Sequence, residues 1–295
     1  MKPPPVSYAR TTRIEDALEL LVRHGEEAKL LAGGQSLIPL LNFRMARPSV
    51  LIDINPIRSL DFIREGPGGT IEIGALTRQR DLERSPLVAR SCPILAAAAS
   101  RIGHAQIRNR GTVGGSIAHA DPAAELPLAL VGLEGEIAVR SPSGRRSIAA
   151  SDFFTGLWET ALRRDEILEA VRVPALPPAA GWSFDEVTHR AGDFAVAAAA
   201  VVLALDPSGR IERCVVALSG TGTRPVRLSG VEAALVGTAP SPDAFAEAGR
   251  RVATLGGFRS DVRADAGYRG RVAAYLVEEG LSRAAGRARG GGGRQ

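Results

Sequence analysis

Two glycine-glycine turns that end in serine carry the residue types best suited to chemistry in this sequence. One spans residues 32–36 (Ala-Gly-Gly-Gln-Ser) and the other spans residues 112–116 (Thr-Val-Gly-Gly-Ser). Glycine adopts positive φ and lacks a Cβ, so consecutive backbone N–H groups can converge on an anion, and the serine hydroxyls add further donors. A single turn of this kind is more often an ordinary chain reversal. Two of them could clamp the pyrophosphate of a dinucleotide without any lysine.

Other nucleotide-binding loops are excluded by their spacing. A Rossmann fingerprint requires Gly-x-Gly-x-x-Gly between a strand and a helix, a P-loop requires Gly-x-x-x-x-Gly-Lys-Ser/Thr, and neither occurs in a usable context. Lys2 and Lys29 are the only lysines, and no carboxylate cluster for magnesium stands out, as phosphate transfer would require. These observations favour a dinucleotide held mainly by backbone amides.

Short elements are expected to position the two turns. A capping box at Thr12-Arg-Ile-Glu15 and helical spacing of apolar residues predict a helix that ends at Gly25. Apolar runs predict strands before and after the first turn, and Thr77 is expected to cap a helix before a long alanine-rich helix over 86–102. Beyond the second turn, the sequence predicts a helix over 123–131 and strands over 136–139 and 166–173. This pattern indicates an α+β fold rather than a doubly wound sheet.

A proline-rich segment over 174–181 divides the chain. We therefore expect a first domain over 1–176, with lobes at 1–56 and 57–176, and a C-terminal domain over 177–286. Asp206-Pro-Ser-Gly209 joins two apolar runs and predicts a hairpin. Helices are expected over 242–254 and over 266–284, where Gly280 could break the second. Residues 287–295 are expected to be disordered.

Composition indicates a soluble globular protein of two domains. Hydrophobic residues make up 45% of 295 residues, and the sequence has neither an apolar run long enough to span a membrane nor a signal peptide, so a cytoplasmic location is expected. The net charge is +5, yet aromatic residues are only 4% and the arginines are scattered, which argues against nucleic-acid binding. Cys92 and Cys214 are too few for an iron–sulfur cluster made by this chain alone and are expected to be buried.

The residues around both turns carry a family resemblance. Over 29–39, 49–55 and 107–127, the sequence resembles the FAD-bearing medium subunit of the molybdenum hydroxylases, the family of carbon monoxide dehydrogenase and xanthine dehydrogenase. The resemblance extends from about Val6 to about Glu279. It implies a two-part, PCMH-type (vanillyl-alcohol-oxidase-like) FAD-binding domain followed by a small α+β domain. The FAD-binding residues that it implies or that the two turns supply are Ala32, Gly33, Gly34, Gln35, Ser36, Leu37, Ile102, Thr112, Val113, Gly114, Gly115, Ser116, Glu125, Leu168 and Phe194.

Several of these residues keep a structural alternative. The resemblance gives Glu125 to the ribityl hydroxyls of the flavin, although an acid near a helix N-terminus is also stabilised by the helix dipole. Ile102 either contacts the cofactor or is simply the last apolar residue of a buried helix. Leu168 and Phe194, an aromatic candidate for the isoalloxazine ring, could instead belong to the core.

Nearby charged residues suggest other roles. His119 and Asp121 could be taken for an acid–base pair, but a structural role in a turn is the preferred interpretation because the histidine lacks a metal or nucleophile partner. His104 could approach the flavin or close a helix. Some relatives carry a basic side chain facing the flavin just after the linker, where this chain has Asp185 and Glu186, so that contact is not carried over.

The resemblance implies an electron-transfer subunit. FAD, bound non-covalently, would take electrons from the [2Fe–2S] clusters of a small partner subunit and pass them to NAD, a quinone or oxygen. Substrate hydroxylation would belong to a large subunit with the molybdenum cofactor, in a dimer of heterotrimers. Two alternatives stay open: a stand-alone FAD-dependent oxidase, and a non-enzymatic module that binds phosphate or nucleic acid.

Overall fold

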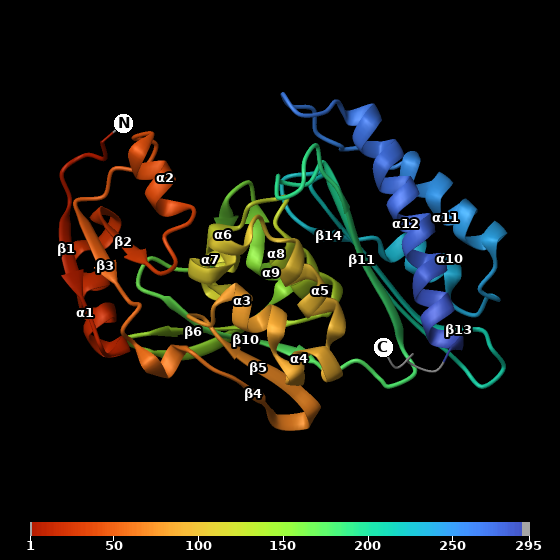
Figure 1. Cartoon of the computed structure of the whole chain (residues 1–295), viewed down its shortest axis with the longest axis horizontal. Helices are drawn as coiled ribbons and strands as arrows, with labels where there is room; N and C mark the ends of the chain where they lie inside the picture. Colours follow the sequence, from red (N-terminus) through yellow and green to blue (C-terminus); the bar gives the residue numbers. More distant parts are fainter. Residues whose placement is uncertain (1, 291–295) are drawn as a thin grey trace.

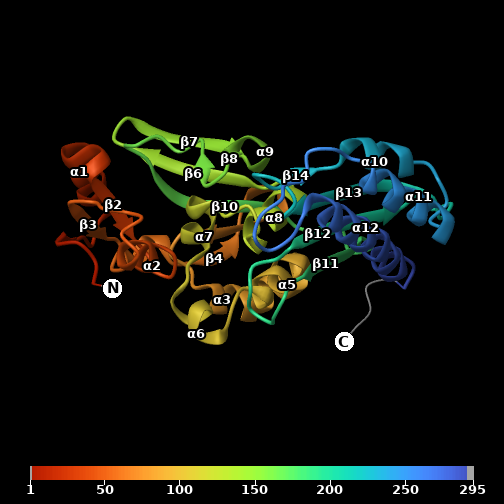
Figure 2. The ribbon, with the colours of Figure 1, turned by 90° about the horizontal axis from the view of Figure 1, so that it is seen from above.

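The computed structural model describes residues 2–290 and has three parts along its longest axis (Figure 1). A small N-terminal lobe lies at one end, a larger second lobe occupies the middle, and a sheet covered by helices forms the other end. The view from above keeps the same order (Figure 2). Helices and sheets alternate irregularly along the chain, so the expected α+β class is confirmed.

The N-terminal lobe is built on a three-stranded parallel sheet in the order β1-β3-β2. Helix α1 packs its buried residues Ile14, Ala17, Leu18 and Leu21 into the core of this lobe. The expected capping box is absent, because α1 begins after Arg13 and no side chain caps it. The elements are β1 (Ser7–Arg10), α1 (Ile14–His24), β2 (Ala28–Leu31), α2 (Leu37–Asn42) and β3 (Val50–Asp53), with a 3-10 turn at Gly25–Glu27.

The second lobe is built on a five-stranded antiparallel sheet in the order β4-β5-β10-β6-β7. Its strands are β4 (Ile63–Glu65), β5 (Thr70–Gly74), β6 (Glu136–Ser141), β7 (Gly144–Ala149) and β10 (Ile167–Pro174), with short 3-10 turns at Arg58–Leu60 and Pro67–Gly69. The small hairpin strands β8 (Phe154–Gly156) and β9 (Glu159–Thr160) pair with each other.

Short helices lie above this sheet (Figure 1). They are α3 (Gln79–Arg84), α4 (Pro86–Ser91), α5 (Pro93–Arg101), α6 (Ala105–Arg110), α7 (Val113–His119), α8 (Glu125–Gly132) and α9 (Ala150–Phe153). The single helix expected over 86–102 is wrong: Pro93 starts a new helix after Cys92, because proline cannot donate the backbone hydrogen bond of a helix interior. Thr77 also does not cap α3, since its hydroxyl donates to the Phe62 carbonyl.

The C-terminal part is a four-stranded antiparallel sheet in the order β11-β12-β13-β14. The predicted hairpin at Asp206 joins β12 to β13, and α12 runs unbroken through Gly280. Because α12 continues to Arg289, residues 287–289 are helical rather than disordered, and 291–295 lie outside the described residues. The elements are β11 (Gly181–Val187), β12 (Ala197–Leu205), β13 (Ile211–Ser219), β14 (Val226–Arg227), α10 (Ser229–Leu235), α11 (Pro242–Ala253) and α12 (Ala266–Arg289).

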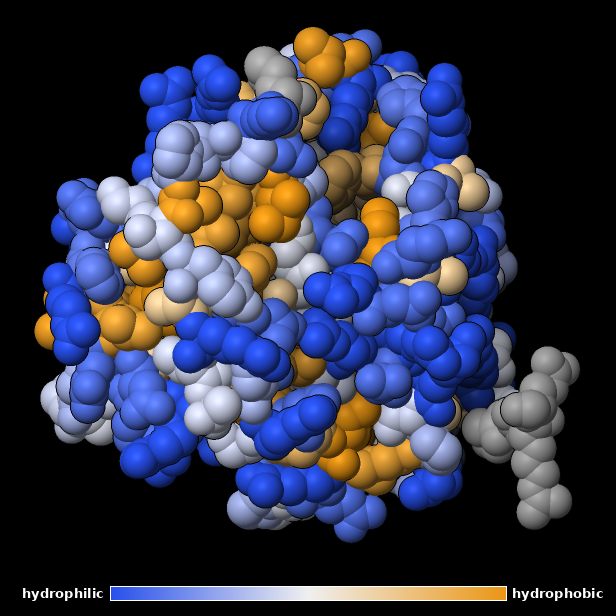
Figure 3. Space-filling view, turned by 60° about the vertical axis from the view of Figure 1, so that its left-hand side comes forward, coloured by the Kyte–Doolittle hydropathy of each residue, from blue (hydrophilic) through white to orange (hydrophobic). Residues whose placement is uncertain are grey.

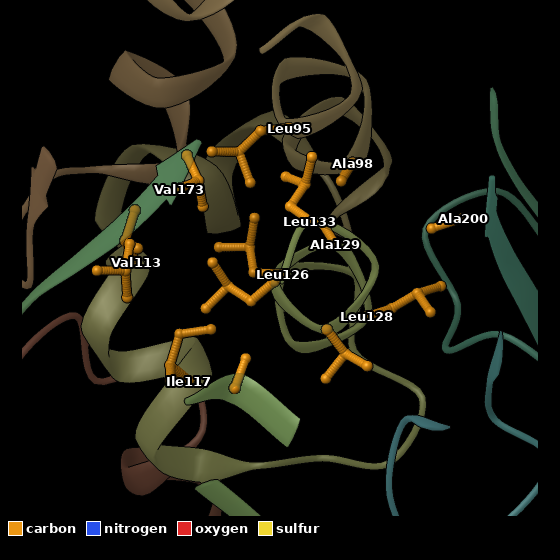
Figure 4. Close-up of a cluster of buried hydrophobic side chains, with 14 of the residues drawn as sticks. Leu95, Ala98, Val113, Ile117, Leu126, Leu128, Ala129, Leu133, Val173 and Ala200 are labelled. Carbon is orange, nitrogen blue, oxygen red and sulfur yellow. The ribbon is translucent and has the colours of Figure 1, made fainter. Parts of the chain in front are cut away.

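One hydrophobic core spans the second lobe and the inner face of the C-terminal sheet. All eight residues of α8 are buried, as expected for a helix that is apolar on every side. Figure 4 shows this core, with Val113 and Ile117 of α7 near Leu126 of α8, and Ala200 of β12 on the far side of α8. Helix α8 therefore joins the two halves of the molecule.

The surface is mixed in character. Figure 3 shows apolar groups separated by hydrophilic ones on the face that brings the N-terminal lobe forward. Within residues 2–290, no helix is both long enough and apolar enough to cross a membrane.

Candidate cofactor-binding site

The two glycine turns lie against each other, although 80 residues separate them. A Cβ added to Gly33 would lie 2.4 Å from the Arg110 carbonyl oxygen and 2.8 Å from the Cα of Gly111. A Cβ added to Gly115 would lie 4.0 Å from the Cβ of Ala32. The N-terminal lobe and the second lobe thus meet backbone to backbone at these turns.

The first turn offers free donors. Within residues 2–290, no hydrogen bond occupies the backbone N–H groups of Gly33, Gly34, Gln35 and Ser36. Gly34 has a φ of 73°, a conformation that glycine adopts without strain. Gly33, Gly34 and Gln35 line an open cleft of about 480 Å³, whose wall also includes Tyr8, Ile38, Asn42, Asp53, Asn55 and Arg110. An anion in this cleft would meet several unpaired N–H groups.

The second turn differs from the first. Residues 113–116 form the start of α7, and Thr112 caps it by accepting a hydrogen bond of 3.0 Å from the Gly115 N–H. The N–H groups of Val113, Gly114 and Ser116 donate to the carbonyls of Thr77, Ala75 and Thr112. The expectation of a second nest of bare amides at positive φ is therefore wrong. Gly114 is needed because a Cβ there would lie 2.8 Å from the Ala75 oxygen.

A polar network that the sequence did not predict holds the turns together. The Asn55 side-chain amide donates to the Ala32 carbonyl at 2.8 Å and accepts from Arg78 at 2.8 Å. Arg78 also donates to the Arg110 carbonyl at 2.6 Å, directly before the second turn. The available signal was the position of Asn55 just past the carboxyl end of a parallel strand, where ligand sites commonly form.

Asp53 adds a charged group to the wall of the cleft. It accepts hydrogen bonds from the Tyr8 hydroxyl at 2.5 Å and from the Asn55 amide at 2.6 Å. Burial raises the pKa of Asp53, but these hydrogen bonds outweigh it and the pKa is lowered. Asp53 is therefore an acceptor at neutral pH, while the neighbouring turn presents donors.

The other predicted site residues lie mainly in the second lobe. Ile102 and Leu168 are buried in the hydrophobic core, 8% and 5% exposed. Phe194 is 44% exposed, and the Arg263 guanidinium lies 5.1 Å from its ring centroid. Ser36 and Leu37 lie at the start of α2. Phe194 is thus the one of these apolar candidates that presents a ring to solvent.

Glu125 lies in the first turn of α8 and is buried. Burial raises the pKa of its carboxyl to about 8, and the nearby carboxylates of Glu186 and Asp121 add to the rise. Both interpretations of Glu125 from the sequence, as a group for the ribityl hydroxyls and as a helix-start acid, fit this position.

The structure favours a turn role for Asp121. Its carboxylate accepts from the Ala123 N–H at 2.9 Å and from the Trp158 indole at 3.4 Å. Burial lowers the pKa of His119, so the imidazole is neutral at physiological pH. The ring of His104 packs against Gly192, where an added Cβ would lie 2.5 Å from its Cε1 atom. His104 thus lies where the second lobe meets the loop before β12.

Metal-binding groups are missing from the described part of the chain. Residues 2–290 contain no group of three or more His, Cys, Asp or Glu placed to hold a metal ion. Cys92 and Cys214 are both buried and free, as predicted, and burial raises the pKa of each thiol to about 12.

Comparison with known proteins identifies the family. Residues 4–176 match the model of the FAD binding domain in molybdopterin dehydrogenase, and residues 182–284 match that of the CO dehydrogenase flavoprotein C-terminal domain. The chain belongs to this flavoprotein family. Its two-domain architecture and its resemblance to the medium subunits of molybdenum hydroxylases are thereby confirmed.

Full-length relatives support this assignment. The chain is 42% identical to the 6-hydroxypseudooxynicotine dehydrogenase complex subunit alpha of Paenarthrobacter nicotinovorans, over 98% of this chain and 97% of that protein. It is 37% identical to the carbon monoxide dehydrogenase medium chain of Hydrogenophaga pseudoflava, over 96% of this chain and 98% of that protein.

Solved structures give the same result. Carbon monoxide dehydrogenase from Hydrogenophaga pseudoflava matches with a TM-score of 0.94 and 38% identity, covering 97% of this chain and 99% of that one. Quinoline 2-oxidoreductase from Pseudomonas putida 86 matches with a TM-score of 0.93 and 33% identity, covering 98% of this chain and 99% of that one. The protein is a flavoprotein subunit of the oxidoreductase class, and FAD is its cofactor.

Proposed function

We propose that this chain transfers electrons through FAD between a partner's [2Fe–2S] clusters and an external acceptor. The observation that carries the proposal is the cleft lined by the unoccupied amides of residues 33–35, with Arg110, shortly before the second turn, in its wall. FAD supplies the redox chemistry when bound. The chain supplies binding and orientation.

The residues fit a dinucleotide. The pyrophosphate would lie against the free N–H groups of Gly33 to Gln35, with Arg110 in the same cleft wall. Glu125 and the buried Ile102 and Leu168 would line the path toward the flavin, with Phe194 beside the ring. Cofactor binding is non-covalent in this proposal, because backbone amides and apolar contacts account for the site without a linking residue.

The partners follow from what this chain contains. Residues 2–290 have two buried cysteines and no group placed to hold a metal ion, so the iron–sulfur clusters of this proposal belong to another subunit. Relatives are named as subunits or medium chains of dehydrogenases, which supports a complex with a small iron–sulfur subunit and a large molybdenum subunit. We further propose a dimer of such heterotrimers in the cytoplasm. The domain division proposed is 1–176, with lobes 1–56 and 57–176, followed by 177–286.

Purification from the native source tests this function. The complex is expected to contain FAD, iron and molybdenum in a fixed ratio, and acid precipitation should release the yellow cofactor into the supernatant. Colour that stays with the pellet would contradict non-covalent binding. A monomer free of both metals that oxidises a small organic substrate would replace the subunit with a stand-alone oxidase. A colourless protein that binds DNA in a salt-sensitive way would point to a nucleic-acid module.

A further inference from the structure

Arg110 brings a positive charge to the cofactor cleft. It is the last residue of α6 and lies shortly before the second glycine turn. Its side chain is exposed, and it lines the same cleft as Gly33, Gly34 and Gln35, whose backbone N–H groups are free. Among residues 2–290, Arg110 is the one arginine or lysine in this wall. A bound anion would therefore meet this side chain together with the free amides.

The backbone of Arg110 is fixed beside the first turn. Its carbonyl oxygen accepts a hydrogen bond of 2.6 Å from Arg78 and lies so close to Gly33 that a Cβ there would be 2.4 Å away. Arg78 also donates to the Asn55 side chain, which in turn donates to the Ala32 carbonyl at 2.8 Å. The start of the Arg110 side chain is thus held next to the free amides, and its guanidinium can reach an anion bound to them.

Neighbouring arginines have protein partners that Arg110 lacks. Arg108, two residues earlier on α6, forms an ion pair of 2.8 Å with Glu83. Arg80 of α3 donates to an asparagine side chain of α6 at 3.3 Å. Within residues 2–290, the guanidinium of Arg110 has neither an ion pair nor a hydrogen bond, and only its backbone is used. All its side-chain donors are therefore available to a ligand.

The charges around the cleft also favour an anion at Arg110. Among the described residues of the wall, only Asp53 carries a carboxylate, and its oxygens already accept hydrogen bonds from Tyr8 and Asn55. Burial and the positive charge of Arg110 lower the pKa of Arg78, although nearby carboxylates act in the opposite direction. Two cations thus lie close together, and an anion bound at Arg110 would reduce their repulsion.

We propose that Arg110 forms an ion pair with the phosphates of bound FAD and sets the affinity together with the amides of the first turn. The inference rests on the proposed position of FAD in this cleft. The planar guanidinium can donate two parallel hydrogen bonds to phosphate oxygens. The amides fix where the phosphates lie, and Arg110 neutralises negative charge that uncharged amides leave in place.

The salt dependence of FAD binding tests this role. After FAD removal, the dissociation constant is measured by flavin fluorescence at about 0.05 M and about 0.5 M NaCl, and it should rise with salt in the wild type because salt screens an exposed ion pair. Arg110→Gln should raise the constant about tenfold at low salt and make it much less dependent on salt. Arg110→Lys keeps the charge but loses the planar pair of donors, so its constant should be intermediate and should keep the wild-type salt dependence.

Arg80→Gln is the matched control, because it removes the same charge from an exposed arginine that does not line the cleft. Its dissociation constant and salt dependence should equal those of the wild type, and thermal unfolding of all the variants checks that they are folded. A wild-type constant or an unchanged salt dependence in Arg110→Gln, or an equal loss in Arg80→Gln, would overturn the inference while leaving FAD binding intact. Failure of the wild type to bind FAD would remove the proposed function together with the inference.

Discussion

The substitution Gly33→Ala tests whether the contact between the two turns is needed to bind the cofactor. The φ of Gly33 is not in the left-handed region, so alanine is allowed there by backbone conformation. The obstacle is space, because the new Cβ would lie 2.4 Å from the Arg110 oxygen, whereas ordinary contact begins at 3.4 Å. Both neighbouring atoms are backbone, and Arg110 is held by Arg78. The turns must therefore separate by about 1 Å to accept the methyl group.

The size of the effect follows from that displacement. Overfilling a packed contact costs about 1 to 3 kcal/mol of folding stability. The same shift moves the free amides of the first turn relative to Arg110 in the cleft wall, so FAD binding should weaken by about tenfold or more, which corresponds to about 1.4 kcal/mol. Gly33→Val carries a larger side chain and should abolish FAD retention.

The assay compares flavin occupancy, from the ratio of flavin to protein absorbance, with thermal unfolding of the same samples. Gly34→Ala introduces strain at a φ of 73° but no contact shorter than 3.2 Å, so it should cost about 1 kcal/mol of stability. Gly230→Ala, with nothing within 4 Å of the added Cβ, should match the wild type. His119→Ala and Asp121→Ala should lower occupancy far less than Gly33→Ala. If Gly33→Ala retained the flavin occupancy of the wild type, the contact between the two turns would not be needed for FAD binding.

Other expected outcomes concern single contacts. Thr112→Ala should lower the free energy of unfolding by about 1 kcal/mol through loss of the cap on Gly115, and Thr112→Ser should restore most of it, as measured by urea titration. Asn55→Ala removes the hydrogen bond to the Ala32 carbonyl and should therefore weaken FAD binding, as measured by flavin fluorescence. The folding of the C-terminal sheet should change very little. Arg269→Met removes the buried guanidinium that donates to the Val196 and Gly220 carbonyls, while Asp261 keeps Arg259, so it should cost about 1 to 3 kcal/mol by urea titration. Burial alone would raise the pKa of Asp261, but hydrogen bonds from arginines and backbone N–H groups lower this pKa below its ordinary value. The ionised carboxylate therefore stabilises the folded protein above about pH 4, and this stabilisation is lost as the pH falls. Asp261→Asn should flatten this acid limb of a stability–pH curve.

Local patterns predicted the elements whose signals lie within a few residues. Asp206-Pro-Ser-Gly209 gave the hairpin because its turn chemistry is local, and Gly25 ended α1 as expected. The predictions failed where contacts with other segments of the protein determined the start of a helix. Thr12 matched a capping box, yet the chain enters α1 from the parallel strand β1, and the helix begins one residue too late for the threonine to cap it.

The two turns show the same limit at the site. Their similar sequences predicted similar nests, but the second turn enters a helix and its amides are taken by Ala75, Thr77 and Thr112. Thr112 belongs to the turn itself, but Ala75 and Thr77 come from the end of β5 and the loop after it, so no local pattern could reveal those two partners. The role of Asn55 was missed for the same reason, since its partners Ala32 and Arg78 are supplied by other segments.

The complete burial of α8 has a consequence during protein synthesis. Its outer face packs on β12 and β13, and Gly132 ends the helix 65 residues before Ala197 begins β12. At about 5 to 20 residues per second, the ribosome needs about 3 to 13 seconds to supply that strand. During this interval the outer face of α8 has no strand to cover it. Truncation before β12 should therefore give an aggregating product, and chaperone binding to stalled nascent chains should peak after α8 emerges and fall once β13 is complete.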